Sequence, residues 1–369
     1  MLIFDAHLDL AWNAIDWNRD LTLEVDEIRR GEACAADVGT AHGGAAHGVR
    51  KKGAGRGTTS LPELRRAEVG ICVATVLDRT ARPETDVPGF PGSASQELSY
   101  AKAQGQLAYY RALEHLGWMR AITDTASLDA HLADWRDDPD TTPLGYILSM
   151  EGGDPIVEPD WVASWHDQGL RAIGPAHYGV SRYAHGTSRP GGLTEDGRVL
   201  LREMQALDMV LDLSHLADEA FWQAIELYDG PVIASHNNCR ALVPGDRQFS
   251  DEQIRAIAER GGAIGVALDA WMLYPGWIRG ETDPSVVAMD AVVDQIDHVC
   301  EVTGTNEHVA IGSDLDGGFG TEQTPRDLDT IADLQRIPEL LRQRGYEERA
   351  IEGIMHGNWL RVFGGALAR

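Results

Sequence analysis

Eight short apolar runs rich in β-branched residues recur along this 369-residue chain and constrain its fold more than any other feature. Their apolarity is continuous rather than alternating, which is typical of strands buried on both faces, as in a parallel sheet. Stretches with helical periodicity, such as 193–207 and 250–260, lie between them. The alternation predicts an α/β fold, a closed (β/α)8 TIM-type barrel with loop insertions. The predicted strands are 2–6, 71–77, 145–150, 171–176, 209–214, 231–235, 263–268 and 308–313.

The length of the chain fits one decorated barrel. Barrels of this class routinely form one domain of about 250 residues, so we expect residues 1–369 to be a single domain. Two segments depart from the alternation of strand and helix. Residues 39–57 are too rich in glycine for a helix or strand interior, and we expect an inserted loop. Residues 83–95 carry Pro and Gly and are predicted to link into a helix near 97–116.

The acidic composition argues against several classes of partner. A net charge of −26 disfavours binding to a nucleic-acid backbone or to an anionic membrane. The opening residues MLIFDAHLDL lack the basic and apolar regions of a signal peptide, and no apolar run approaches the roughly 20 residues that span a bilayer. Four widely spaced cysteines without a CxxC motif indicate neither a disulfide scaffold nor a thiolate zinc site. We expect a cytoplasmic protein with no membrane and no nucleic-acid partner.

Residues that can bind metal or transfer protons follow the predicted strands. In a (β/α) barrel the carboxyl ends of the strands converge on one mouth, where active sites are found. Each such residue alone is weak evidence for an active site, but their convergence at one mouth is stronger evidence. Six of the eight strands end in His7 with Asp9, Glu151, His177, His215, His236 and Asp314, and the other two end at Asp78 and Asp269.

Five of these groups form a donor set of imidazoles and carboxylates without thiolate, which suits a catalytic zinc or a similar divalent ion. A single catalytic zinc usually takes three protein ligands, so five indicate two metals with a shared bridging group. None of the three lysines lies at a predicted strand end, which excludes a carboxylated lysine as the bridge. Glu151 is the only glutamate at a strand end and is therefore the predicted bridge. The five are His7, Asp9, Glu151, His215 and His236.

Six motifs occur in a fixed order, and most of them lie beyond residue 145. They are DAHLDL at 5–10, MEGG at 150–153, GGLTEDGRVLLREMQALDMVLDLSH at 191–215, SHNNCRALVPGDRQFSDEQI at 235–254, HVAIGSDLDG at 308–317 and GNWLRVF at 357–363. Through this ordered set the chain resembles the membrane dipeptidase (renal dipeptidase) family of zinc peptidases, within the amidohydrolase-like barrels.

The resemblance implies a binuclear zinc dipeptidase that hydrolyses the peptide bond of small dipeptides with metal-activated hydroxide. By that resemblance, His7 and Asp9 would hold one Zn²⁺ and His215 and His236 the other. Glu151 would bridge the two ions. A homodimer is a possible assembly, because dimers are common in families of this type.

Three further roles follow from the resemblance. His177 matches the family histidine that contacts the substrate and its tetrahedral intermediate. Arg247, eleven residues after His236, falls where the family places the arginine that binds the substrate carboxylate. Asp314 matches the aspartate near the substrate amino group and the bridging water, and it would transfer the proton.

Some segments depart from the family pattern and leave the substrate open. Asp154 stands where family members often have histidine, and the loops YGVSRYAHG and DAWMLYP differ from those of the renal enzyme. An alternative is therefore a related barrel amidohydrolase that acts on N-acyl amino acids, β-lactams or lactones. A non-catalytic barrel that serves only as a binding module would lack some of the ligands, yet all five are present.

Overall fold

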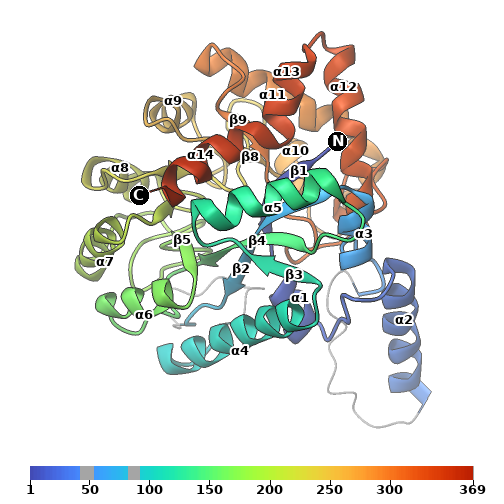
Figure 1. The fold of residues 1–369 in the computed structure, drawn as a ribbon, viewed down its shortest axis with the longest axis horizontal. Helices are drawn as coiled ribbons and strands as arrows, with labels where there is room; N and C mark the ends of the chain where they lie inside the picture. Colours follow the sequence, from blue (N-terminus) through green and yellow to red (C-terminus); the bar gives the residue numbers. More distant parts are fainter. Residues whose placement is uncertain (42–53, 82–91, 369) are drawn as a thin grey trace.

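The computed structural model describes residues 1–41, 54–81 and 92–368, without the side chains of 34–41. All eight predicted strands are present and parallel to their neighbours (Figure 1). Their cores are buried because helices cover one face and the barrel interior the other. The strands are β1 (Ile3–Leu8), β2 (Val69–Leu77), β4 (Leu144–Glu151), β5 (Leu170–Gly174), β6 (Val210–Asp212), β7 (Val232–Ile233), β8 (Ile264–Val266) and β9 (Val309–Ile311).

The strand order is that of a TIM-type barrel. One sheet has the path β1-β2-β4-β5-β6-β7, and β8 pairs with β9. A parallel bridge from Ala234 to Ile264 joins β7 to β8. At the remaining seam β1 contacts β9, and the Asp5 side chain accepts a hydrogen bond from the Ser313 backbone N–H at 2.9 Å. The predicted fold class is therefore confirmed.

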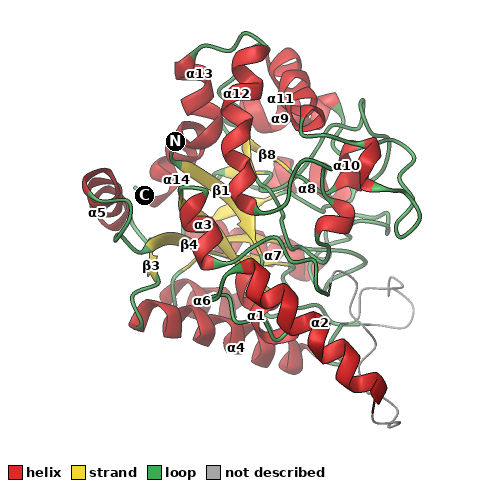
Figure 2. Ribbon diagram, turned by 90° about the vertical axis from the view of Figure 1, so that its right-hand side faces the viewer, coloured by secondary structure: helices red, strands yellow, loops and turns green. Residues whose placement is uncertain are grey.

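Helices surround the strands in both views (Figure 1, Figure 2). Polar residues cap several of them; in one capping box Ser250 and Gln253 exchange side-chain to backbone hydrogen bonds at the start of α9. The helices are α1 (Leu10–Asp16), α2 (Val25–Ala41), α3 (Leu61–Arg66), α4 (Gln96–His115), α5 (Thr125–Asp137), α6 (Val162–Asp167), α7 (Glu195–Ala206), α8 (Asp218–Leu227), α9 (Asp251–Glu259), α10 (Ala270–Leu273), α11 (Asp290–Thr303), α12 (Ile337–Gln343), α13 (Glu348–Glu352) and α14 (Asn358–Leu367).

Two elements differ from the prediction. A short strand, β3 (Met119–Ala121), pairs with β4 outside the barrel path. Helix α2 extends to Ala41, so the first three residues of the predicted 39–57 loop are helical despite Gly39. Residues 42–53 of that loop and 83–91 of the predicted linker lie outside the described residues, while α4 confirms the helix predicted near 97–116.

Helix α14 closes one end of the barrel. Its Trp359 and Phe363 belong to the apolar cluster that contains inward side chains of the strands, such as Phe4. The rings of Phe363 and Phe4 stack with centroids 5.5 Å apart, and the Trp359 indole N–H donates to the Ile311 carbonyl at 2.8 Å. This closure leaves the carboxyl ends of the strands as the open mouth. In the described part of the chain, no helix has the length and apolar character to cross a membrane.

Candidate active site

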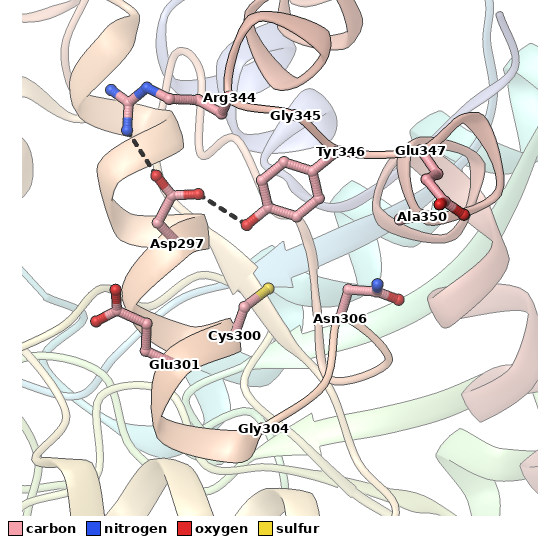
Figure 3. Close-up of a pocket in the computed structure, with 10 residues that line it drawn as sticks. All are labelled: Asp297, Cys300, Glu301, Gly304, Asn306, Arg344, Gly345, Tyr346, Glu347 and Ala350. Carbon is pink, nitrogen blue, oxygen red and sulfur yellow. Dashed lines mark hydrogen bonds and ion pairs between the residues drawn. The ribbon is translucent and has the colours of Figure 1, made fainter.

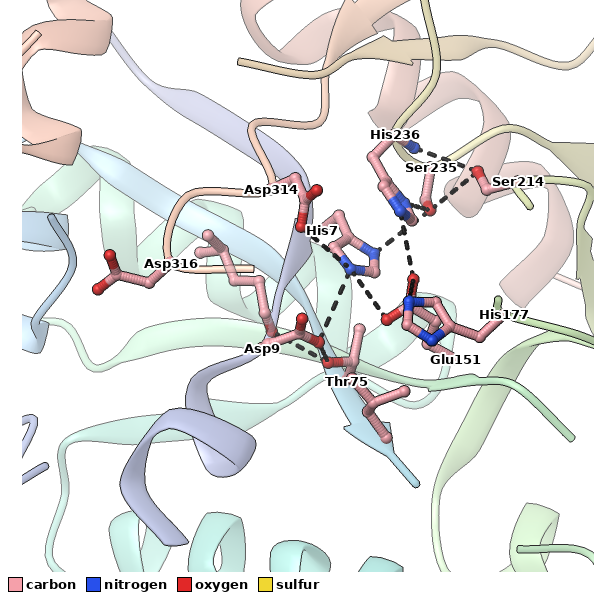
Figure 4. A network of polar contacts seen from close by, with 12 residues as sticks. His7, Asp9, Thr75, Glu151, His177, Ser214, Ser235, His236, Asp314 and Asp316 are labelled. Carbon is pink, nitrogen blue, oxygen red and sulfur yellow. Dashed lines mark hydrogen bonds and ion pairs between the residues drawn. The ribbon is translucent and has the colours of Figure 1, made fainter. Parts of the chain in front are cut away.

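The predicted metal ligands and Asp314 converge at the carboxyl ends of the barrel strands (Figure 4). His7 lies near the end of β1, and Glu151 is the last residue of β4. Three sets of donor atoms each lie within 4.8 Å of one another. The sets are His7 with Glu151 and His236, Glu151 with His177 and His215, and His7 with Asp9 and Asp314.

Glu151 divides its two oxygens between two groups of ligands. Its Oε2 lies 3.6 Å from His7 Nε2, and His7 Nε2 lies 3.7 Å from Asp9 Oδ1. Its Oε1 lies 3.3 Å from His215 Nε2 and 3.2 Å from His236 Nε2. The carboxylate therefore stands between a His7–Asp9 pair and a His215–His236 pair.

The donor atoms of this cluster fit a divalent cation. His7 Nε2 and Glu151 Oε1 are buried and make no hydrogen bond within the described residues, which is costly unless another partner satisfies them. The Nε2 atoms of His215 and His236 face each other at 3.1 Å, where at most one proton fits between them. Imidazole nitrogens and carboxylate oxygens are the ligands that zinc takes in catalytic sites. Cations bound on the two sides of Glu151 would satisfy these four atoms.

Hydroxyl groups orient two of the imidazoles. Thr187 Oγ1 lies 3.0 Å from His215 Nδ1 and 3.3 Å from the His215 carbonyl, to which it can donate. Ser235 Oγ lies 2.8 Å from His236 Nδ1. If each hydroxyl oxygen accepts a hydrogen bond from Nδ1–H, the lone pair of Nε2 points into the cluster, as a metal ligand requires. Glycine permits the close approach here, since a Cβ at Gly265 would lie 1.9 Å from the Ser235 carbonyl oxygen.

These hydroxyls are functional residues that the sequence prediction misses. Thr75, on β2, donates to Asp9 Oδ1 and holds that carboxylate beside His7. The available signal is a repeated Ser-His pair at two strand ends, which includes Ser235. Thr187 has no such signal, because it reaches His215 from a loop 28 residues away.

Unfavourable local geometry concentrates at the cluster. His215 has φ of 67° and Asp314 has φ of 58°, a region that costs a non-glycine residue about 1–3 kcal/mol. Asp9 stands at the N-cap of α1, yet its side chain makes no capping hydrogen bond. An N-cap aspartate normally accepts a bond from the first turn. These conformations are locally unfavourable, and they occur at residues whose side chains point into the barrel mouth.

Glu151 is the ionised centre of the cluster. Burial alone would raise its pKa, yet the neighbouring imidazoles outweigh burial and hold that pKa well below its usual range. Burial lowers the pKa values of His215 and His236 far below normal, so both rings are neutral. His7 differs, because the carboxylates of Glu151 and Asp9 overcome burial and raise its pKa well above the ordinary value. A carboxylate among mainly neutral imidazoles is the protonation state that metal ligands need.

Asp314 and His177 border the ligand cluster. Asp314 Oδ1 lies 3.8 Å from His7 Nε2, and burial raises the pKa of Asp314 well above its usual range. His177 Nε2 lies 3.9 Å from Glu151 Oε1, and burial lowers the pKa of His177. Both side chains keep some exposure at the mouth, 14% for Asp314 and 13% for His177. They can therefore meet a ligand that enters there.

Arg247 is a buried cation beside the cluster. It is 2% exposed, and its guanidinium donates to Asn237 Oδ1 at 2.5 Å and to the His236 carbonyl at 2.8 Å. Both partners are neutral, and among the described residues no carboxylate forms an ion pair with it. A buried guanidinium held by neutral groups retains its capacity to bind a carboxylate.

The other acidic residues singled out from the sequence have partners of their own. Asp78 forms an ion pair with Lys102 of α4 at 3.1 Å, and this lysine is far from a bridging position. Asp269 accepts from the Gln323 amide at 2.8 Å and pairs with Arg279 at 3.5 Å. Asp154 accepts hydrogen bonds from two backbone N–H groups, those of Thr80 after β2 and Arg182 after β5, and holds the two loops together.

A surface hollow of about 670 Å³ lies elsewhere, between α11 and the start of α13 (Figure 3). Its Asp297 already accepts from Tyr346 Oη at 2.7 Å and from Arg344 Nη1 at 2.6 Å. It contains none of the predicted site residues, and the barrel mouth therefore stays the candidate active site.

The chain matches a known protein family over almost its whole length. The sequence model of "Membrane dipeptidase (Peptidase family M19)" matches residues 1–368. An uncharacterised protein of the pqqA 5′ region of Klebsiella pneumoniae is 34% identical over 207 residues, 54% of this chain and 73% of that protein. Mouse dipeptidase 3 is 27% identical over 60% of this chain, and the match spans only 45% of the mouse protein.

The fold has solved counterparts. A metallopeptidase from Rhodobacter sphaeroides, solved with a phosphinate mimic of the dipeptide L-Ala-D-Ala, superposes with a TM-score of 0.74. The two chains are 23% identical, and the match covers 100% of this chain and 98% of that one. This likeness shows the fold, and the family match over residues 1–368 establishes that the chain belongs to the membrane dipeptidase family, peptidase family M19, and is a metal-dependent dipeptidase.

Proposed function

We propose that this chain hydrolyses dipeptides at a centre of two zinc ions held by the five predicted ligands. The proposal rests on the position of the Glu151 carboxylate between two donor groups. Its Oε2 faces His7, while its Oε1 faces His215 and His236. A carboxylate with its oxygens toward two separate donor sets is what two metals with a shared bridge require. His7 with Asp9 would hold one ion, and the other two histidines the second.

The proton transfers would belong to Asp314. Zinc held by these ligands would lower the pKa of a bound water from about 16 to near 7 and would polarise the scissile carbonyl. Asp314 borders the ligands at 3.8 Å from His7 Nε2 and has a raised pKa. A carboxylate of this kind takes a proton from water readily and returns it to the leaving amine.

His177 and Arg247 would bind two different parts of the substrate, the scissile carbonyl and the C-terminal carboxylate. His177 stands next to Glu151 with part of its ring exposed, so its N–H can donate to the oxyanion that forms at the carbonyl carbon. Such a donor contributes roughly 3–4 kcal/mol in other hydrolases. Arg247 would pair with the free C-terminal carboxylate of the substrate in a two-point contact. That contact favours dipeptides over longer chains, because it places the C-terminus one residue from the scissile bond.

Metal analysis and hydrolysis together test the proposal. The protein, purified without chelator, is expected to hold near two zinc per chain and to cleave a panel such as L-Ala-L-Ala and L-Ala-D-Ala. Glu151→Gln should lose metal and activity, because an amide cannot present two anionic oxygens. The matched control is Glu63→Gln, a buried glutamate on α3 bound to Arg66 and Thr330, which should keep both.

Each outcome separates the candidate functions. Two metals with chelator-sensitive cleavage of dipeptides support the proposal. Two metals with cleavage only of N-acyl amino acids, β-lactams or lactones would replace the substrate and keep the centre. No metal and no cleavage would refute both. The cytoplasmic location, the homodimer and the single domain over residues 1–369 stay predictions from the sequence.

A further inference from the structure

Asn13 joins the two loops that carry Asp9 and Asp314. It lies on α1 and is 3% exposed. Its side-chain Nδ2 donates to the Asp9 carbonyl at 3.1 Å and to the Asp316 carbonyl at 2.9 Å. One amide group therefore connects the loop after β1 to the loop after β9, across 303 residues of sequence.

Arg19 fixes the orientation of that amide. Its Nη1 donates to Asn13 Oδ1 at 2.8 Å and to Asp316 Oδ2 at 3.1 Å. Because a guanidinium only donates, the amide oxygen of Asn13 must face it and the NH₂ group must face the two carbonyls. Arg19 is itself held by Glu32 of α2 through Nε at 2.7 Å.

Asp316 anchors the other side of this network. It is 1% exposed and has φ of 64°, a strained conformation for a non-glycine residue. Besides Arg19, its carboxylate accepts from the Thr58 N–H at 2.8 Å, the Thr58 hydroxyl at 2.8 Å and the Thr59 N–H at 3.0 Å. Figure 4 shows Asp316 directed away from the ligand cluster while Asp314 points into it. Both oxygens of the Asp316 carboxylate accept hydrogen bonds, and they do so on the side that faces away from the ligand cluster.

We propose that Asn13, Arg19 and Asp316 are positioning residues that set the separation between Asp9 and Asp314. The inference rests on the proposed function. His7 Nε2 lies 3.7 Å from Asp9 Oδ1 and 3.8 Å from Asp314 Oδ1, so a shift of one loop against the other changes both distances. The side chain of Asp9 is held by Thr75 of β2, but it makes no cap to α1 and so does not tie its loop to that helix. The network supplies that link from behind the ligands.

Asn13→Ala tests the inference against a matched control. Asn358→Ala removes a similarly buried amide, whose Nδ2 donates to the Asn306 and Val309 carbonyls at the opposite end of β9. Three readouts are compared: thermal unfolding, metal retained during dialysis against a chelator, and kcat and KM for a dipeptide. Both variants should lose stability. Only Asn13→Ala should lose metal affinity or kcat, by about 10- to 100-fold as outer partners of metal ligands do elsewhere.

Arg19→Lys provides a second variant in case Asn13→Ala does not fold. The lysine keeps the charge but cannot reach all three partners, so metal retention and kcat should fall while KM changes little. The control is Arg260→Lys. Among the described residues, the guanidinium of Arg260 donates only to backbone carbonyls, those of Ile225, Tyr228 and Gly230. Equal losses of metal and kcat in each pair of variants would overturn the positioning role. If the unsubstituted enzyme holds metal and cleaves dipeptides, such a result would overturn the positioning role alone. If it neither holds metal nor cleaves dipeptides, the proposed function and the positioning role are both overturned.

Discussion

The role proposed for Arg247 can be isolated with one substitution and one change of substrate. Arg247→Met removes the charge and keeps much of the side-chain length. The substitution also removes the hydrogen bonds to Asn237 Oδ1 and to the His236 carbonyl, which hold the loop after β7. A loss of activity alone would therefore not distinguish carboxylate binding from positioning of His236.

The magnitude follows from the burial of the guanidinium. Arg247 is 2% exposed and its partners are neutral, so a carboxylate that reaches it forms a desolvated, charge-assisted pair. Removal of one partner of such a pair costs about 2–5 kcal/mol. At about 1.4 kcal/mol for each factor of ten, kcat/KM for a dipeptide should fall about 30-fold to about 4,000-fold.

The assay compares a dipeptide with its C-terminal amide. The unsubstituted enzyme should discriminate against the amide by a factor of similar size, because the neutral amide leaves the guanidinium unpaired. Arg247→Met should treat both substrates nearly alike, since the contact is already absent. The four values of kcat/KM form a cycle whose coupling free energy reports the pair directly.

An equal loss on both substrates would refute the reasoning. That result would mean that Arg247 acts only through His236 and Asn237, as a positioning residue. Metal content of the variant provides the internal check, because displacement of His236 would lower it, while loss of a substrate contact would not.

Three further predictions follow from the site and its support. Because Asp314 would act as the base, kcat/KM should fall at low pH, where its carboxylate becomes protonated, and Asp314→Asn should abolish activity without loss of thermal stability. Burial raises the pKa of Asp269 from 3.8 to about 6, so the folded protein without metal binds this proton more tightly than the unfolded chain. As pH rises from about 4 to about 6, the contribution of Asp269 to the free energy of unfolding should therefore fall by up to about 3 kcal/mol. In urea titrations, Asp269→Asn should make the free energy of unfolding depend less on pH in this range. Trp359→Ala at the closed end should cost about 3–5 kcal/mol of unfolding free energy but leave metal content unchanged; a loss of metal would contradict the separation of the two ends.

The barrel strands are predictable because each is buried on both faces. Strands β2 and β4 are buried along their whole length, so their apolar runs are continuous in the sequence. Strand β3 is missed because it has three residues, two of them only partly buried, and lies outside the barrel path. The end of α2 is missed because one glycine costs a helix only about 1 kcal/mol, so Gly39 alone does not stop it.

Some residues of the site could likewise be predicted from the sequence, and others could not. Ligands such as Glu151 could be predicted because strand ends converge, and convergence depends only on topology. Thr75 and Thr187 could not, since their contacts depend on which rotamer faces which ligand across the mouth. Asn13 and Arg19 were beyond prediction for the same reason, because their partner Asp316 lies about 300 residues away.

The link between the first and last strands has a consequence for biosynthesis. Asn13 contacts Asp316 across 303 residues, and the seam between β1 and β9 depends on Asp5 and Ser313. During synthesis the amino-terminal part of a chain emerges first. His7 and Asp9 are therefore made early, yet they cannot take their final places until β9 has left the ribosome. The complete set of ligands would therefore come together only after β9 has been made, late in folding.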